Sequence, residues 1–223
     1  GVCVDCEMTI EQDTVQDDSA EVNGGDANND PAAAQTGENG EGGEDGSAED
    51  ENKAPDYTAQ IGENKFETLG EALTAMQPGN TVTLLDNVTE NLILKTDGTI
   101  DLVDFSITGL VAVQANVTFV GGSVNQGDIA VAAIVINSGS LTLDGTTVTG
   151  GNGISVETTE EVSVIVGGTV KATEGYGICQ NVSDAKEKGT LNVTSTENAR
   201  IEAKTVGVEI INGSYTSESK ADR

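Results

Sequence analysis

The chain has 223 residues, of which 38 are acidic, 10 are basic and none is histidine, so its net charge is −28. A polypeptide this acidic repels nucleic-acid phosphates and anionic membrane surfaces, so neither is expected as a partner. The sequence has no apolar run of about 18 residues, so we expect no membrane insertion and no signal peptide within it.

The first 56 residues differ in composition from the rest. They hold 17 acidic residues and a single lysine, Lys53, and residues 11–56 contain no aromatic residue and few branched aliphatic ones. Such a stretch buries too little apolar surface to offset about 1–2 kcal/mol of backbone entropy per ordered residue. We therefore predict a disordered acidic linker over residues 1–56, followed by a folded domain over residues 57–223.

Two of the three cysteines, Cys3 and Cys6, form a C-x-x-C pair ahead of the linker. A zinc site needs two further ligands, but the chain has no histidine and only Cys179 is left. A redox centre would need a βαβ context that the linker does not provide. We therefore expect two thiols or a small local disulfide, and the redox state of the pair stays open.

The folded domain is predicted to begin with two short strands and a helix. Residues 57–61 and 65–66 have strand composition around a turn at 62–64. Within residues 68–76, Thr68 and Glu71 have the spacing of a capping box and the apolar residues fall on one helical face. We expect this helix to cap the open end of a repeating β structure, whose first layer would otherwise expose its interior.

The chain then continues with strand patterns and no second good helix. Apolar residues alternate with Thr, Ser, Asn and Asp in residues 81–85, 98–102, 115–120, 140–143, 162–166 and 189–193. Pairs of residues rich in glycine are predicted to be the turns between these strands: Gly121-Gly122, Asp144-Gly145, Gly150-Gly151 and Gly167-Gly168.

A short phrase recurs in the second half of the chain, a small residue followed by Ile or Val. It occupies residues 133–137, 153–157, 177–181 and 207–211, with starts 20, 24 and 30 residues apart. Spacings of this size are typical of solenoid coils. We therefore predict an all-β fold, a right-handed parallel β-helix with an N-terminal capping helix. An immunoglobulin-like sandwich is the alternative. In the β-helix, one residue of each phrase stacks inside adjacent coils: Ile134, Ile154, Ile178 and Val208.

Residues 59–73 and 78–85 resemble the opening of pectin-lyase-like right-handed β-helix domains in secreted and surface proteins of gut anaerobic bacteria. The likeness lies in an aromatic residue, a Thr-Leu pair, a Glu-Ala helix, a Gly-Asn turn and a Thr-Val-x-Leu strand. The resemblance implies the fold and an extracellular or cell-surface location. It implies little about catalysis, since many such proteins are adhesin-like.

Polar residues stand at the end of each phrase: Asn137, Glu157, Asn181 and, one place further along, Asn212. Stacked at one turn of successive coils, they would form a hydrogen-bonded ladder. The functional alternative is a row of acceptors for a cation or a glycan. An ice-binding array was also considered, but Thr-x-Thr occurs only at residues 81–83 and 147–149 rather than in every coil.

Evidence for catalysis is thin. Polysaccharide lyases and hydrolases need an acid and a base in a groove, commonly with calcium or arginine, and the chain has two arginines, Arg200 and Arg223. We assign no catalytic, cofactor-binding or metal-binding residue, and calcium is the one cofactor left open. The carboxylates considered as candidates are Asp101, Asp104, Asp144, Glu157, Glu160 and Glu161.

The expected function is therefore an adhesin-like or structural module, with a carbohydrate-active enzyme fragment as the alternative. The expected partners are glycans, or proteins of a host or cell surface. Residues 213–217 resume the strand pattern, yet no capping element follows before Arg223. We accordingly expect a domain that is incomplete at its C-terminus, or one that associates with itself through an exposed strand edge.

Overall fold

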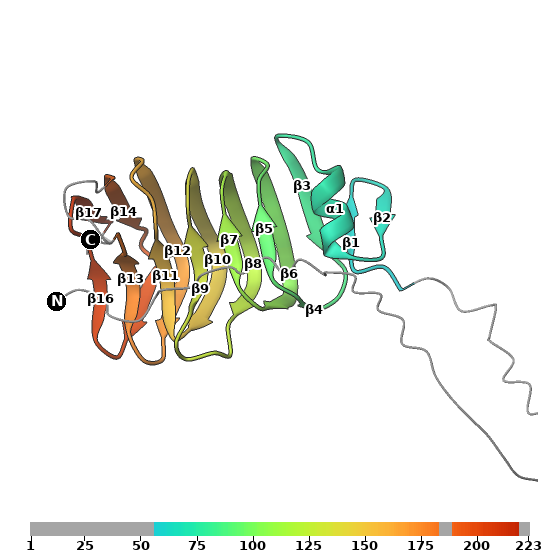
Figure 1. Cartoon of the computed structure of the whole chain (residues 1–223). Coiled ribbons are helices and arrows are strands. Elements are labelled where there is room, and N and C mark those ends of the chain that lie inside the picture. Colours follow the sequence, from blue (N-terminus) through green and yellow to red (C-terminus); the bar gives the residue numbers. More distant parts are fainter. Residues whose placement is uncertain (1–55, 183–188, 219–223) are drawn as a thin grey trace, which may run out of the picture. The chain divides into compact units, whose positions relative to one another are not determined.

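The computed structural model describes residues 56–182 and 189–218, which are mostly β, with parallel-strand sheets and one helix (Figure 1). The predicted β class is thus confirmed. Within this part of the chain every strand pair is parallel except β1–β2 and β1–β3, which argues against an antiparallel sandwich. The predicted linker, apart from Asp56, and the Cys3–Cys6 pair lie outside the described residues, as does Arg223.

The domain opens with a hairpin and a helix, as predicted. Strand β1 (Ala59–Ile61) pairs with β2 (Asn64–Phe66), and helix α1 (Leu69–Ala75) follows. The Glu71 amide donates to the Thr68 hydroxyl oxygen at 3.2 Å, which satisfies one of the free amides of the first helical turn. Leu69, Ala72 and Met76 are buried, so the predicted apolar face is the one that packs.

The strands form three parallel ladders, which the chain visits in turn before returning one strand further along; each such pass is called a coil here. Ladder 1 consists of β3 (Asn80–Leu84), the first halves of β6 (Gly98–Thr108), β8 (Asn116–Asn125), β10 (Ser140–Gly150) and β12 (Val162–Ala172), then β14 (Leu191–Ser195) and β17 (Gly213–Ser217). Ladder 2 consists of β4 (Val88–Thr89), the second halves of β6, β8, β10 and β12, and β15 (Arg200–Ala203). Ladder 3 consists of β5 (Leu92–Leu94), β7 (Val111–Val113), β9 (Ala132–Ile136), β11 (Asn152–Val156), β13 (Tyr176–Gln180) and β16 (Val206–Glu209).

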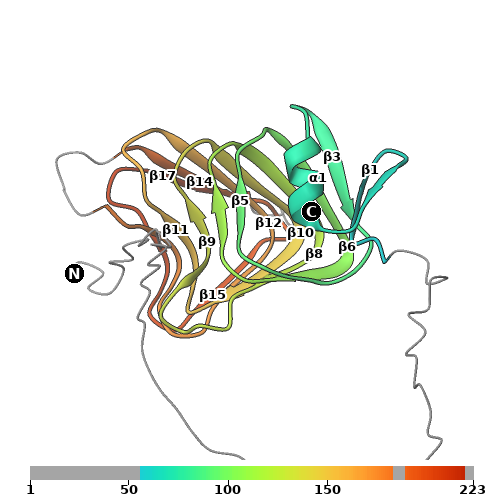
Figure 2. The same ribbon diagram turned by 45° about the vertical axis from the view of Figure 1, so that its right-hand side comes forward.

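The interior is a stack of aliphatic columns, which the oblique view in Figure 2 shows enclosed by the three ladders. In ladder 3, Ile134 pairs with Ile154, Ile154 with Ile178, and Ile178 with Val208. The predicted column is therefore confirmed. The three isoleucines are fully buried, whereas Val208, in the last strand, is only partly buried.

Three of the four predicted glycine turns were wrong as boundaries between strands. Gly121-Gly122 lies within β8, Asp144-Gly145 within β10 and Gly167-Gly168 within β12. At these points the chain turns a corner from ladder 1 to ladder 2 while pairing resumes on both sides, with a register shift after Asp144 in β10. Gly121 has φ 64°, a conformation that glycine adopts at no steric cost. The fourth pair, Gly150-Gly151, does end its strand.

Candidate functional site

The outer face of ladder 1 carries a regular array of small polar side chains. One row runs through seven consecutive strands, and six of its members are threonine: Thr81, Thr99, Thr118, Thr142, Ile165, Thr194 and Thr216. A second row, two residues earlier in each strand, contains Asn116, Ser140, Ser163, Asn192 and Ser214. The rungs repeat about every 4.8 Å, so hydroxyl and amide groups recur at one spacing along the face.

Sequence reasoning missed this array. The threonines are 18 to 29 residues apart in the paired registers, and only the Thr81-Val82-Thr83 motif stood out in the printed sequence. The statement that threonine does not recur at one position was therefore wrong for this row. A search by pairing register rather than by local motif would have found it, because the inward residues of each strand fix which residues face outward.

Serine and asparagine side chains within the second row hydrogen-bond to one another. The Ser140 hydroxyl donates to the Asn116 side-chain oxygen at 2.8 Å, and the Ser214 hydroxyl donates to that of Asn192, also at 2.8 Å. Asp97 precedes Asn116 by one coil and accepts from its backbone amide at 2.8 Å and its side-chain amide at 3.2 Å. These two bonds, the backbone one first, lower the pKa of the Asp97 carboxyl.

Two of the candidate carboxylates share an outward column of ladder 1. Asp101 and Asp144 both pair with Val120, from the strands on either side of it. Two rungs place their Cα atoms about 10 Å apart. Asp144 is exposed, whereas Asp101 is half-buried and accepts the Val103 amide at 3.0 Å. The structure thus brings two carboxylates to one face, at a separation in the range of the acid and base of inverting glycosidases.

The corner beside these carboxylates contains a strained residue. Val103 has φ 54°, in the left-handed region that β-branched residues rarely adopt, and Asp104 follows it, exposed. In the next coil Gly121 occupies the corresponding position, and a Cβ there would lie 2.5 Å from the Val103 carbonyl oxygen. The corner is therefore tightly packed, and no side-chain contact joins Asp104 to the Asp101–Asp144 pair among the described hydrogen bonds.

The remaining candidates lie elsewhere, where the chain leaves β11 for β12. Glu157 accepts from the Ser155 hydroxyl at 3.0 Å and from the Asn181 amide at 3.4 Å. A shallow hollow of about 400 Å³ is lined by Glu157, Thr158, Thr159, Asn181 and Val182. Glu160 is exposed, and Glu161 accepts from the Asn192 amide at 3.1 Å. The six carboxylates therefore do not converge on one site.

The predicted polar ladder holds for three of its four members. The backbone amides of Asn137, Glu157 and Asn181 donate to Val113, Ile136 and Val156 respectively, so the three residues follow one another in adjacent coils. Asn212 does not belong to the row: its backbone amide donates to the Gln180 side chain and its side chain contacts Gly189 and Thr190. A single printed side-chain bond, from Asn181 to Glu157, joins the row, which makes it a structural contact more than an array of free acceptors.

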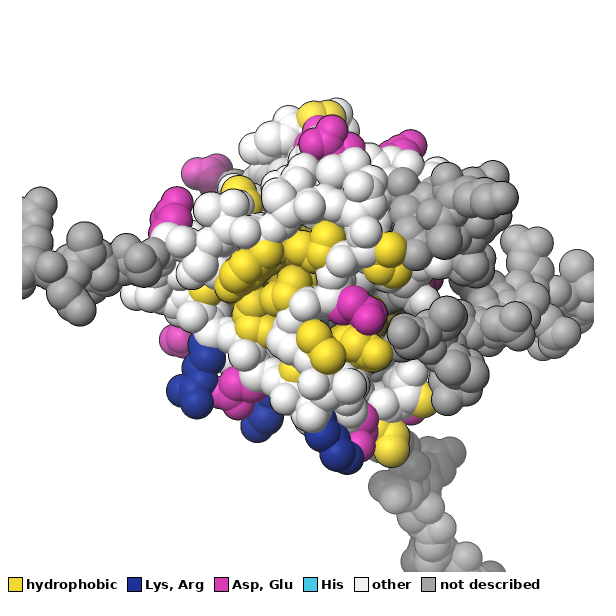
Figure 3. All heavy atoms as spheres, turned by 90° about the vertical axis from the view of Figure 1, so that its left-hand side faces the viewer, with side chains coloured by type: hydrophobic (Ala, Val, Ile, Leu, Met, Phe, Trp, Pro, Cys, Tyr) yellow, Lys and Arg dark blue, Asp and Glu magenta, His cyan; other side chains and the backbone are white. Residues whose placement is uncertain are grey.

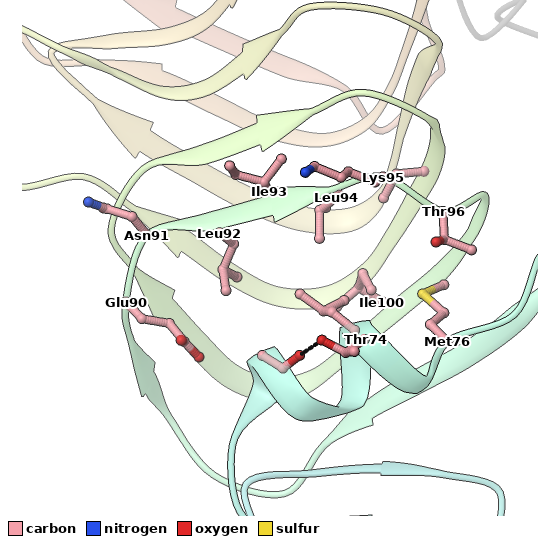
Figure 4. A pocket seen from close by; sticks show the side chains of 13 residues that line it. Thr74, Met76, Glu90, Asn91, Leu92, Ile93, Leu94, Lys95, Thr96 and Ile100 are labelled. Carbon is pink, nitrogen blue, oxygen red and sulfur yellow. Dashed lines mark hydrogen bonds between the residues drawn. The ribbon is translucent and has the colours of Figure 1, made fainter. Parts of the chain in front are cut away.

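A second hollow lies between α1 and the edge strand β5 (Figure 4). It has a volume of about 420 Å³, with Leu73 and Met76 from the helix side and Leu92 and Ile93 from the strand. Leu92 and Leu94 use their backbone groups to pair with β7, so the groups of Ile93 between them point toward this edge. Helix α1 thus covers the first coil of ladder 3 where no strand precedes β5.

Within residues 56–182 and 189–218, no cluster of three or more Cys, Asp or Glu side chains is arranged to hold a metal ion. No helix in the same part of the chain is long and apolar enough to cross a membrane. Comparison of the chain with protein-family models, curated proteins and solved structures found no match.

Proposed function

We propose that the domain is a right-handed parallel β-helix of the pectin-lyase-like kind, serving as a non-catalytic, adhesin-like module at the surface of a bacterium. The three parallel ladders and the continuous aliphatic interior support the fold. The right-handed sense follows from the strong preference of parallel crossover connections for that hand.

The outer face of ladder 1 carries the proposal for function. Its threonine row and its Ser/Asn row present donors and acceptors at a fixed repeat on a rigid support. Glycans offer a matching series of hydroxyl groups, and a rigid array loses little conformational entropy on contact. We therefore assign this face to the binding of extended surface glycans, without a deep pocket and with modest affinity per repeat.

A matched pair of substitutions in one strand tests this assignment. Thr142 and Thr149 both lie in β10 and are half-buried on outward positions, but Thr142 belongs to ladder 1 and Thr149 to ladder 2. Retention of the full chain on immobilised mucin-type and bacterial-wall glycans should fall at least tenfold for Thr142→Glu and stay unchanged for Thr149→Glu. Equal retention of both variants, or no retention of the unmodified chain, would overturn the assignment.

The enzyme alternative is favoured by one observation, the shared column of Asp101 and Asp144. If these residues act as acid and base, the full chain should cleave acidic polysaccharides, assayed with and without calcium. Asp101→Asn and Asp144→Asn should each then abolish cleavage, whereas Asp104→Asn at the neighbouring corner should not. Absence of cleavage across pectate, alginate and glycosaminoglycans supports the structural module.

A further inference from the structure

The last coil leaves part of the interior uncovered. Val208 and Ile210 are half-buried, and Val206 and Ile211 beside them are 40% and 48% exposed. A hollow of about 630 Å³ opens between β15, β16 and β17, lined by Ile201, Val208, Ile210 and Tyr215 among others. Figure 3 views this end of the stack and shows hydrophobic side chains gathered over it. Within the described residues, no strand pairs with the outer edge of β16.

A column of glycines indicates that a further strand belongs on β16. A Cβ at Gly153 would lie 2.5 Å from the Gly177 carbonyl oxygen, and one at Gly177 would lie 2.4 Å from that of Gly207. Each glycine is therefore required by the coil that follows it. At Gly207 the nearest atom to such a Cβ is the Ile201 Cγ2, at 3.8 Å. No described residue requires a glycine there, but an additional strand in the same register would.

The beginning of the chain has the sequence of a ladder 3 strand. Gly1-Val2-Cys3-Val4-Asp5 repeats the order of residue types in Gly153-Ile154-Ser155-Val156-Glu157 and in Gly207-Val208-Glu209-Ile210-Ile211. In each, a glycine is followed by a β-branched residue, an outward residue, and a second β-branched residue. In β11, Ile154 and Val156 are the buried members of this pattern.

We propose that residues 1–5 form the closing strand of ladder 3, added in parallel to the free edge of β16. In this register Gly1 lies beside Gly207, Val2 beside Val208, Cys3 beside Glu209 and Val4 beside Ile210. The strand pairs with the open backbone groups of β16 and covers the half-buried valine and isoleucine. This is addition of a strand to an exposed sheet edge by a segment of the same chain.

The connecting segment has a suitable length. About 50 residues separate Asp5 from β1, and a flexible chain of that length has a root-mean-square end-to-end distance of about 35–43 Å. Seven rungs separate β1 from a strand beyond β16, or about 34 Å. Effective concentration is greatest when the linker length matches the span, so the acidic linker would act as a tether.

A disulfide placed by this register is the direct test. In the full chain carrying Cys6→Ser and Cys179→Ser, the substitution Glu209→Cys puts a thiol beside Cys3, since neighbouring Cα atoms about 5 Å apart suit a disulfide. Mild oxidation should produce an intrachain bond in most molecules, independent of protein concentration, as peptide mapping would show. The matched control, Ser214→Cys in the exposed last strand of ladder 1, should yield less than a tenth as much.

Two further variants separate the register from simple proximity. Gly207→Ala should slow formation of the disulfide at least tenfold, because the added methyl group occupies the position of the neighbouring backbone. Val2→Asp should do the same and should raise hydrogen exchange of the Val206–Glu209 amides at least tenfold, with no change at Ile93. Disulfide-linked dimers would show instead that a second copy occupies the edge. Such dimers, or equal yields from Glu209→Cys and Ser214→Cys, would overturn the proposal.

Discussion

Replacing two isoleucines that lie in neighbouring strands but face opposite sides tests the described packing. Ile154 is fully buried between Ile134 and Ile178, whereas Ile165 lies on the outer face of ladder 1 and is 38% exposed. Truncation of a buried isoleucine to alanine costs about 2–5 kcal/mol. We expect Ile154→Ala in the upper half of that range, because the strands on both sides are fixed by their own ladders and cannot collapse into the cavity.

The outward residue should behave differently. Ile165→Ala removes little buried surface, so its cost should stay below about 1 kcal/mol. At about 2–4 °C per kcal/mol for a domain of this size, Ile154→Ala should lower Tm by about 6–15 °C and Ile165→Ala by less than about 4 °C. Urea unfolding followed by circular dichroism gives both free energies. Similar losses for the two variants would refute the inward and outward assignment of these strands.

Three further predictions follow from the glycine column, the Asp97 carboxylate and the strained corner. Gly177→Ala should destabilise the domain by more than about 2 kcal/mol in thermal unfolding, since its Cβ would lie 2.4 Å from the Gly207 carbonyl oxygen; a loss below about 0.5 kcal/mol would contradict the close approach of the coils. The Asp97 pKa is lowered in the folded chain, so its contribution to stability is present above the unfolded value of about 3.9 and is lost as pH falls through the lower folded value. The Tm deficit of Asp97→Ala should therefore be full near neutral pH and disappear in acid, and a deficit independent of pH would exclude the carboxylate as its source. Val103→Gly should raise stability by about 1 kcal/mol in urea unfolding by relieving a φ of 54°, whereas a loss would show that the valine side chain matters more than the strain.

Several features of the fold could be predicted because they depend on local signals. The N-cap of α1 followed from the spacing of Thr68 and Glu71, and the ladder 3 column followed from the small residue that precedes Ile154 and Ile178. Strands β5 and β7 were not predicted, because each has only three residues and is recognisable mainly by the strand it pairs with. The corners were mistaken for strand ends because a glycine pair indicates a bend but not whether pairing resumes beyond it.

The candidate surface shows the same division. The candidate carboxylates were named from the sequence, but the pairing of Asp101 and Asp144 with a shared Val120 depends on coils 19 and 24 residues long. The threonine row was invisible for the same reason, since unequal coil lengths hide a column that is regular in space. Composition and hydrophobic alternation by themselves determined the β class, the capping helix and the inward residues, because burial selects side chains within a single strand. Only the tertiary structure decided which outward side chains become neighbours, because those contacts depend on backbone pairing between strands separated by loops of varying length.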